Sequence, residues 1–181
     1  MDASTLRPVN CVDDGAFMGN FTDENSSPSQ LLTSTIADEL KIATRNKGLV
    51  YAIAPFRDAA ILGAGHAGNG AFWLNNNTGK WCSTTYYNEF PWWLSQYNDR
   101  KSPDYRIKDM VWTPALPFTN YTFLPEWRNE PFKYKLDGER TNKFRRLITS
   151  PFINEEVNLL TEELLNKSCL LYTSPSPRDT R

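Results

Sequence analysis

The sequence is poor in the residues that build metal and nucleophile sites, because it holds one histidine and three widely spaced cysteines among 181 residues. Cys11, Cys82 and Cys169 match neither a disulfide framework nor a zinc ribbon, so we expect buried free thiols. A catalytic zinc usually takes three protein ligands, and a lone histidine such as His66 is more often a hydrogen-bonded structural residue than a ligand. The G-x-S-x-G elbow of the Ser-His-Asp hydrolases is also missing.

Strong charge of one sign and long apolar runs are missing as well. The chain has 20 basic and 21 acidic residues, and the net charge of -1 is spread along it. That balance gives no electrostatic footprint for nucleic acid or for an anionic membrane. No apolar run approaches the roughly 20 residues that a membrane span needs, and the first residues lack the features of a signal peptide. If Met1 is the natural start, we expect a soluble chain without a nucleic-acid surface.

A helix followed by a buried strand is the clearest pattern that is present. Ser27-Pro28-Ser29-Gln30 offers an N-cap, a proline at the first helical position and a capping-box partner. Apolar residues follow at helical spacing, so the pattern predicts an amphipathic helix over residues 28–44. Residues 49–54 form an uninterrupted apolar run, which is typical of a strand covered on both faces. Together these segments predict an α/β fold in which the helix packs on the strand.

The middle of the chain predicts a β-hairpin. Residues 71–74 and 81–87 have the composition of strands. Between them, the Asn-Asn-Asn-Thr-Gly-Lys sequence of residues 75–80 is typical of a hairpin loop. Further elements are expected later in the chain: a short helix at 91–97, loops and short strands at 101–150, and a final helix capped by Asn154.

A glycine cluster over residues 63–68 matches the G-x-G-x-x-G pattern literally. The dinucleotide fingerprint needs these glycines in the turn directly between a strand and a helix. Here eight residues separate Ala54 from Gly63, and the segment after Gly70 is strand-like. No acidic residue stands about 20 positions beyond to hold a ribose. We therefore expect the glycines to serve tight backbone packing rather than nucleotide binding.

Tryptophan and tyrosine crowd the middle of the chain, from Trp73 to Trp127. Exposed aromatic side chains could stack on sugars, so a stand-alone carbohydrate-binding or other non-enzymatic binding module is one hypothesis. Buried aromatic side chains would instead fill a core, and the large area that each one buries favours this second interpretation.

Several blocks of the sequence resemble the alkaline phosphatase family of the type found in Bacteroidetes, within the alkaline phosphatase and nucleotide pyrophosphatase/phosphodiesterase superfamily. The matching blocks are residues 9–13, 27–40, 59–66, 71–73, 77–79, 83–87 and 149–152. Their order and spacing agree over residues 9–165. None of the blocks is itself the catalytic motif of the family.

The resemblance implies a partial alkaline-phosphatase-like α/β sandwich over residues 1–168, with helices on a mixed sheet and an inserted β-hairpin. It also implies a periplasmic or secreted parent enzyme with two zinc ions and a Thr or Ser nucleophile. Such a parent hydrolyses small-molecule phosphate mono- or diesters, because metals and cations stabilise the charge of phosphoryl transfer. In the family, the nucleophile and the remaining zinc ligands lie outside the matching segment. We therefore expect no catalytic residue and no metal ligand in this chain, which alone should be inactive.

One departure from the family concerns the substrate phosphate. In family phosphomonoesterases, a Lys-x-Arg pair just before the A-I-L-x-A-G-H block grips it. The matching positions here are Phe56 and Asp58, with Arg57 between them. The clamp is therefore missing or shifted by one residue, which leaves Arg57 as the candidate substrate-binding residue and leaves room for a phosphodiesterase or pyrophosphatase. A solvated surface pair of Arg57 and Asp58 is the alternative.

The last residues have a different character. Residues 169–181 resemble the translation of a sequencing adapter read in frame. We expect a disordered tail of foreign origin there, with the natural sequence ending near Ser168. A disordered natural tail rich in Pro and Ser is the alternative.

Overall fold

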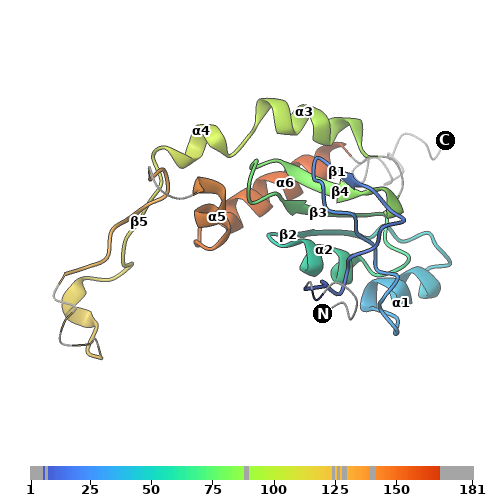
Figure 1. Ribbon diagram of the computed structural model, residues 1–181, viewed down its shortest axis with the longest axis horizontal. Helices are drawn as coiled ribbons and strands as arrows, with labels where there is room; N and C mark the ends of the chain where they lie inside the picture. Colours follow the sequence, from blue (N-terminus) through green and yellow to red (C-terminus); the bar gives the residue numbers. More distant parts are fainter. Residues whose placement is uncertain are drawn as a thin grey trace, which may run out of the picture.

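A four-stranded mixed sheet with helices packed around it forms the body of the molecule in this computed structural model (Figure 1). The structure describes residues 6, 8–87, 90–123, 125, 127, 130–138 and 142–167. The predicted tail, residues 169–181, lies outside this part of the chain.

The strand order in the sheet is β1-β4-β3-β2. Strand β2 (Tyr51–Ala54) runs parallel to β3 (Gly70–Leu74), whereas β4 (Trp81–Thr84) is antiparallel to both β3 and β1 (Gly19–Asn20). Parallel and antiparallel neighbours in one sheet, with helices around it, confirm the predicted α/β class.

Helix α2 (Arg57–Ala64) connects the two parallel strands. Parallel neighbours need a crossover connection, and α2 supplies it. The helix buries Ala60, Ile61 and Ala64. Because β2 and β3 point the same way, their carboxyl ends lie at one edge of the sheet. The segments that follow both strands therefore meet there.

The predicted hairpin between β3 and β4 is confirmed. The side chain of Asn75 accepts hydrogen bonds from the backbone N–H groups of Asn77 and Thr78, and Gly79 has a φ of 67°. The second strand is shorter than predicted. It ends at Thr84, whose hydroxyl accepts the N–H of Tyr86, and a 3-10 turn occupies residues 85–87.

The first predicted helix begins later than expected. Helix α1 spans Ile36–Ala43, and its N-cap is Thr35, which forms a capping box with Asp38. The predicted start at Ser27 is wrong because that side chain is buried and otherwise engaged. Its hydroxyl donates to Asp14 at 2.5 Å and accepts the N–H of Ser29 at 3.0 Å.

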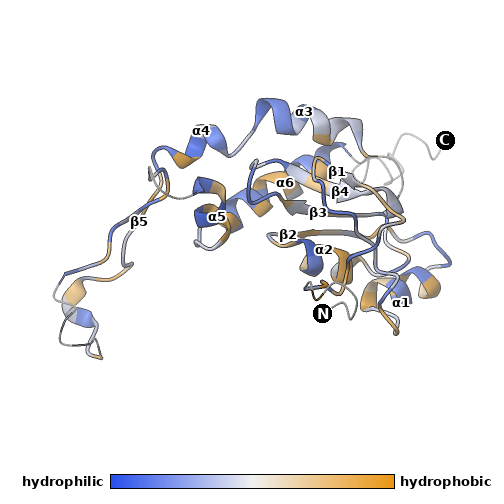
Figure 2. Ribbon diagram, in the orientation of Figure 1, coloured by the Kyte–Doolittle hydropathy of each residue, from blue (hydrophilic) through white to orange (hydrophobic). Residues whose placement is uncertain are grey.

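The predicted packing face of this helix is also wrong. Helix α1 buries Ala37, Asp38 and Lys41 and lies beside α2, not on the strand. The apolar stripe points outward, with Leu32 99% and Ile36 91% exposed, and apolar residues colour α1 in Figure 2. Asp38 sets this orientation, because its carboxylate accepts a hydrogen bond from the backbone N–H of Ala67, in the turn that follows α2.

Strand β2 is covered on both faces, as predicted, because Tyr51 and Ile53 pack against one apolar cluster and Ala52 and Ala54 pack against another. Its four residues are nevertheless only half-buried. It is the last strand of the sheet in the part of the chain that the structure describes, and β3 is its neighbour there. Helix α2 packs on it, and helix α6 (Ile153–Lys167) also contacts it.

The second half of the chain is more helical than predicted. The expected short helix exists as α3, and the final helix α6 begins one residue before Asn154, its predicted cap. Residues 101–150 were expected to hold only loops and strands, yet two short helices form there. Asn142 caps the second of them by accepting two backbone N–H groups. The elements are α3 (Trp92–Arg100), α4 (Asp104–Ile107), β5 (Val111–Trp112), η2 (Phe118–Asn120), β6 (Tyr134–Lys135) and α5 (Lys143–Ile148).

Strands β5 and β6 pair with each other in an arm that projects from the body (Figure 1).

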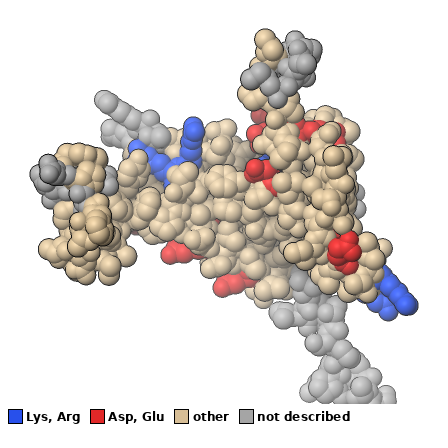
Figure 3. Space-filling view, turned by 90° about the horizontal axis from the view of Figure 1, so that it is seen from below, with Lys and Arg blue, Asp and Glu red and all other residues tan. Residues whose placement is uncertain are grey.

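On the face of the molecule shown in Figure 3, charged side chains are scattered among neutral ones. No helix of the described residues is long and apolar enough to cross a membrane.

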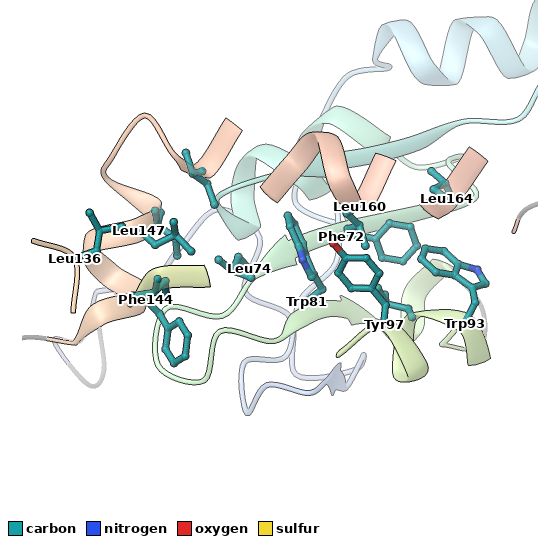
Figure 4. Close-up of a cluster of buried hydrophobic side chains, with 14 residues drawn as sticks. Phe72, Leu74, Trp81, Trp93, Tyr97, Leu136, Phe144, Leu147, Leu160 and Leu164 are labelled. Atoms are coloured by element: carbon teal, nitrogen blue, oxygen red, sulfur yellow. The ribbon is translucent and has the colours of Figure 1, made fainter. Parts of the chain in front are cut away.

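Two apolar clusters pack on the two faces of β3. Phe72 and Leu74 point into the larger one with Trp81 (Figure 4). Ala71 and Trp73 belong to the smaller one. Several aromatic residues predicted to fill the core do so: Trp73, Trp81, Tyr87 and Trp93 are buried, whereas Trp92 and Trp127 are exposed.

The cysteines agree only in part with the expectation of buried thiols. Cys82 is fully buried in the smaller cluster, but Cys11 is exposed, so the prediction is wrong for that residue. Cys169 lies outside the described residues. Burial raises the pKa of the Cys82 thiol to about 12, which leaves it protonated at neutral pH.

Candidate functional site

A cavity of about 500 Å³ opens where the parallel strands end. Residues 55–58 follow β2, residues 75–77 follow β3, and both segments line the cavity. The rest of the wall comes from the end of β3, from the N-terminal segment and from α5 and the residue after it: Trp73, Leu74, Asn10, residues 22–24, Arg145, Ile148 and Thr149. In open α/β sheets, ligands bind in the crevice outside the carboxyl ends of the strands. The cavity is therefore the candidate functional site, and it contains the candidate residue Arg57.

Arg57 is held in place by the N-terminal segment. Its Nη2 donates to Oδ1 of Asp13 at 2.8 Å, its Nη1 donates to the hydroxyl of Ser26 at 3.2 Å, and its Nε lies 3.8 Å from Oε2 of Glu24. The side chain of Arg57 is 13% exposed. Its ion-pair partners are thus Asp13 and Glu24 rather than the neighbouring Asp58 that the surface-pair alternative names. The guanidinium lies at the cavity with its charge already balanced.

Sequence patterns alone did not identify Asp13 and Glu24 as partners of Arg57. Asp13 and Arg57 are 44 positions apart, and no spacing rule links them. The structure brings them together because Asp13 and Ser26 form a β-bridge that places the N-terminal segment against the start of α2. Asp13 does fall in the first block of the family resemblance, which is the one signal that marks it.

The rest of the wall is polar and carries charges of both signs. Three carboxylates, from Asp23, Glu24 and Asp58, line the cavity together with the guanidinium groups of Arg57 and the exposed Arg145. The wall also includes an apolar ring. The side chain of Phe56, the N-cap residue of α2, lines the cavity and the residue is 52% exposed.

The single histidine lies in a separate place, at the end of α2. Its Nδ1 is 3.4 Å from Oδ2 of Asp38, a buried carboxylate on α1. Burial raises the pKa of Asp38, but hydrogen bonds from the backbone N–H groups of Thr35 and Ala67 and from the Thr35 hydroxyl outweigh it, so the pKa lies below its ordinary value. The carboxylate thereby joins α1 to the turn after α2.

The glycine cluster occupies the second half of α2 and the same turn. Gly65 has a φ of 66°, and a Cβ there would lie 2.2 Å from the hydroxyl oxygen of Thr35. The cluster lies at the C-terminal end of a helix instead of connecting a strand to the start of one, so it is not a dinucleotide fingerprint. Its role in tight packing, predicted from the sequence, is confirmed at Gly65.

Metal ligands do not gather in the part of the chain that the structure describes. No group of three or more His, Cys, Asp and Glu side chains there is arranged to hold a metal ion. The described residues therefore do not fit the two zinc ions that the family resemblance implies, and no chemical step through a metal is assigned to them.

Comparison with known proteins finds two relatives that are named alkaline phosphatases. The chain is 31% identical over 150 residues to the alkaline phosphatase PhoV of Synechococcus elongatus, and 34% identical over 148 residues to the alkaline phosphatase PafA of Elizabethkingia meningoseptica. These matches cover 81% and 79% of this chain, but 27% of each relative. A protein of Myroides odoratus named as a calcium-transporting ATPase is 37% identical over 121 residues, which is 66% of this chain and 22% of that protein. No family model matches the chain.

The fold comparison agrees with the sequence comparison. The crystal structure of wild-type PafA superimposes with a TM-score of 0.71 and 27% identity, covering 87% of this chain and 34% of that one. A second PafA structure, with the same similarity, carries four substitutions, two of them at a lysine and an arginine two positions apart. The chain thus spans about a quarter to a third of the length of the relatives that it matches.

Proposed function

Because the chain is a homologue of the Bacteroidetes-type alkaline phosphatases, we propose that it forms one wall of the substrate cavity of a phosphoric ester hydrolase whose catalytic centre is built by other residues. The joint match to PafA in sequence and fold carries this proposal. The proposed parent enzyme acts in the periplasm or outside the cell. It binds two zinc ions, which supply the charge that stabilises phosphoryl transfer, and it uses a Thr or Ser nucleophile.

The part assigned to this chain is binding and orientation of the ester. Arg57 is the proposed substrate-binding residue, since its guanidinium lies at the cavity and can donate to a phosphate oxygen. Helix α2 and the contacts with Asp13 and Ser26 fix the position of that guanidinium. A preorganised donor stabilises a charged group without first losing side-chain freedom, which favours orientation of the ester.

The kind of ester follows from the altered clamp. Phe56 and Asp58 stand where the family resemblance places the lysine and the arginine, so the two phosphate-gripping positions hold no cation and one carboxylate, and Arg57 between them is the remaining cation. We therefore propose hydrolysis of a phosphodiester or a phosphoanhydride rather than of a simple monoester. The similarity to a protein named as an ATPase is compatible with a phosphoanhydride substrate.

Expression of the chain alone tests where the catalytic centre lies. After dialysis, metal analysis should find less than one zinc per chain, and neither p-nitrophenyl phosphate nor bis-p-nitrophenyl phosphate should be turned over. Two bound zinc ions with chelator-sensitive turnover would contradict the proposal. A pull-down with insoluble polysaccharides separates it from the carbohydrate-binding hypothesis, which requires retention of the chain on the solid.

A further inference from the structure

We propose that the cavity beside β2 and β3 selects a singly charged phosphodiester with an aromatic substituent, which packs on Phe56, and discriminates against doubly charged phosphate. The inference rests on the proposed function and names its substrate class. It depends on three observations: an exposed ring at the cavity, an arginine that is already paired, and an excess of carboxylates in the wall.

The ring of Phe56 is placed to contact a ligand. Phe56 is the N-cap residue of α2, so the helix fixes its backbone, and its side chain provides no hydrogen bond to the helix end. The residue is 52% exposed although it lines a cavity. An aromatic face left in water gains most from another flat, apolar surface, because aromatic pairs contribute beyond the area that they bury. An aromatic substituent of the substrate supplies such a surface.

Arg57 cannot serve as a free clamp for a dianion. Its guanidinium already contacts the carboxylates of Asp13 and Glu24, and the side chain is mostly buried, so it would have to leave both partners to enclose a phosphate. Its hydrogen bonds to Asp13 and Ser26 use two of the five N–H donors of a guanidinium, so the remaining donors can contact a ligand oxygen without loss of either partner. A single negative charge on the ligand is enough for that contact.

The other charges of the wall act against a second negative charge. Asp23 is exposed and Asp58 is half-buried, and both line the cavity with Glu24, whereas Arg145 is the further cation of the wall. Carboxylates near a doubly charged ligand repel it about twice as strongly as a singly charged one. The wall therefore favours diesters through its charge and aromatic diesters through its ring.

Binding to the full chain, without metal and without catalysis, tests the proposal. Isothermal titration in chelator-containing buffer would compare bis-p-nitrophenyl phosphate, p-nitrophenyl phosphate and inorganic phosphate. We expect the diester to bind at least about threefold more tightly than inorganic phosphate. Replacing Phe56 with Ala should weaken diester binding about two- to twelvefold. Phe56→Leu, which keeps an apolar side chain and should preserve the fold, should also weaken it. Phe123→Ala is the matched control, since Phe123 is 99% exposed and does not line the cavity.

The ion pair between Arg57 and Asp13 allows a second, independent test in the same experiment. Asp13→Asn releases one carboxylate from Arg57, so inorganic phosphate should bind about threefold more tightly or better. Equal binding of the three ligands, or diester binding unchanged in both Phe56 variants, overturns the inference. So does the absence of saturable diester binding. None of these outcomes affects the zinc and turnover result that tests the proposed function.

Discussion

A side chain at position 65 would collide with Asp38. The Cβ of an alanine at Gly65 would lie 2.6 Å from Oδ2 of Asp38, closer than such atoms approach in proteins. Gly65 also has a φ of 66°, in the region that favours glycine. The glycine thus permits α1 and the turn after α2 to meet, and the carboxylate of Asp38 then joins them.

Gly65→Ala should therefore destabilise the chain strongly. We expect a loss of about 2–4 kcal/mol in the free energy of unfolding, from backbone strain and displacement of Asp38. Gly63→Ala is the matched control in the same motif. It lies inside α2, and its Cβ would meet Ala52 at an ordinary 3.5 Å, so the variant should be neutral or up to about 1 kcal/mol more stable. Urea denaturation followed by circular dichroism measures both, and equal effects would refute the proposed contact.

The capping box of α1 should have a measurable contribution to stability. Thr35→Ala removes the side chain that accepts the N–H of Asp38, and it should cost about 1 kcal/mol. Thr33→Ala provides the control, since Thr33 is exposed and precedes the helix; its effect should stay within about 0.5 kcal/mol. The urea denaturation midpoints of the two variants, each compared with the wild type, test this prediction. A larger loss at Thr33 would mean that the helix starts elsewhere.

Asp38 should make the stability dependent on pH. Its pKa is lowered in the folded state, so the unfolded chain binds the proton more readily. The stabilisation is therefore fully present above the ordinary aspartate value of about 4 and is lost as the pH falls through the lowered value. Urea unfolding between pH 2 and 6 should show this loss in the wild type and a smaller loss in Asp38→Asn. An identical pH dependence in the two proteins would contradict the assignment.

Cys82 should be unreactive while the sheet is intact. Burial raises its pKa to about 12, and the thiol lies in the core, so neither the thiolate nor access is available at pH 8. In a Cys169→Ser background, N-ethylmaleimide should label Cys11 alone in native protein and both thiols in urea. Intact mass spectrometry counts the adducts. Rapid double labelling of the native protein would show that β4 is not buried.

Local sequence patterns were sufficient to predict an element where the segment contains only one such signal. The Asn-rich loop and its flanking apolar residues were sufficient for the hairpin, because the hydrogen bonds that close the turn lie within residues 75–80. The start of α1 was missed because the segment contains two capping signals. Ser27-Pro28 satisfies the local rule, but Asp14, 13 positions away, takes the serine hydroxyl, and Thr35 caps the helix.

Long-range contacts explain the remaining differences. The apolar side of α1 faces outward, contrary to the prediction from its periodicity, because the buried Asp38 determines which side of the helix faces inward. At the cavity, the sequence indicated Arg57 but neither Asp13 nor Glu24, because ion pairs between residues 44 and 33 positions apart leave no local pattern. The resemblance to a family indicated the fold, and the charge balance of the cavity became visible only in three dimensions.

A chimera tests the central claim most directly. Residues 9–165 of this chain would replace the matching segment of PafA, and kcat/KM would be measured for p-nitrophenyl phosphate and bis-p-nitrophenyl phosphate. We expect chelator-sensitive turnover and a diester-to-monoester ratio above that of PafA itself. The double substitution Phe56→Lys with Asp58→Arg in the chimera should move the ratio back toward the monoester. A folded, zinc-replete chimera that turns over neither ester would contradict the assignment of this chain to the substrate cavity of a phosphoric ester hydrolase.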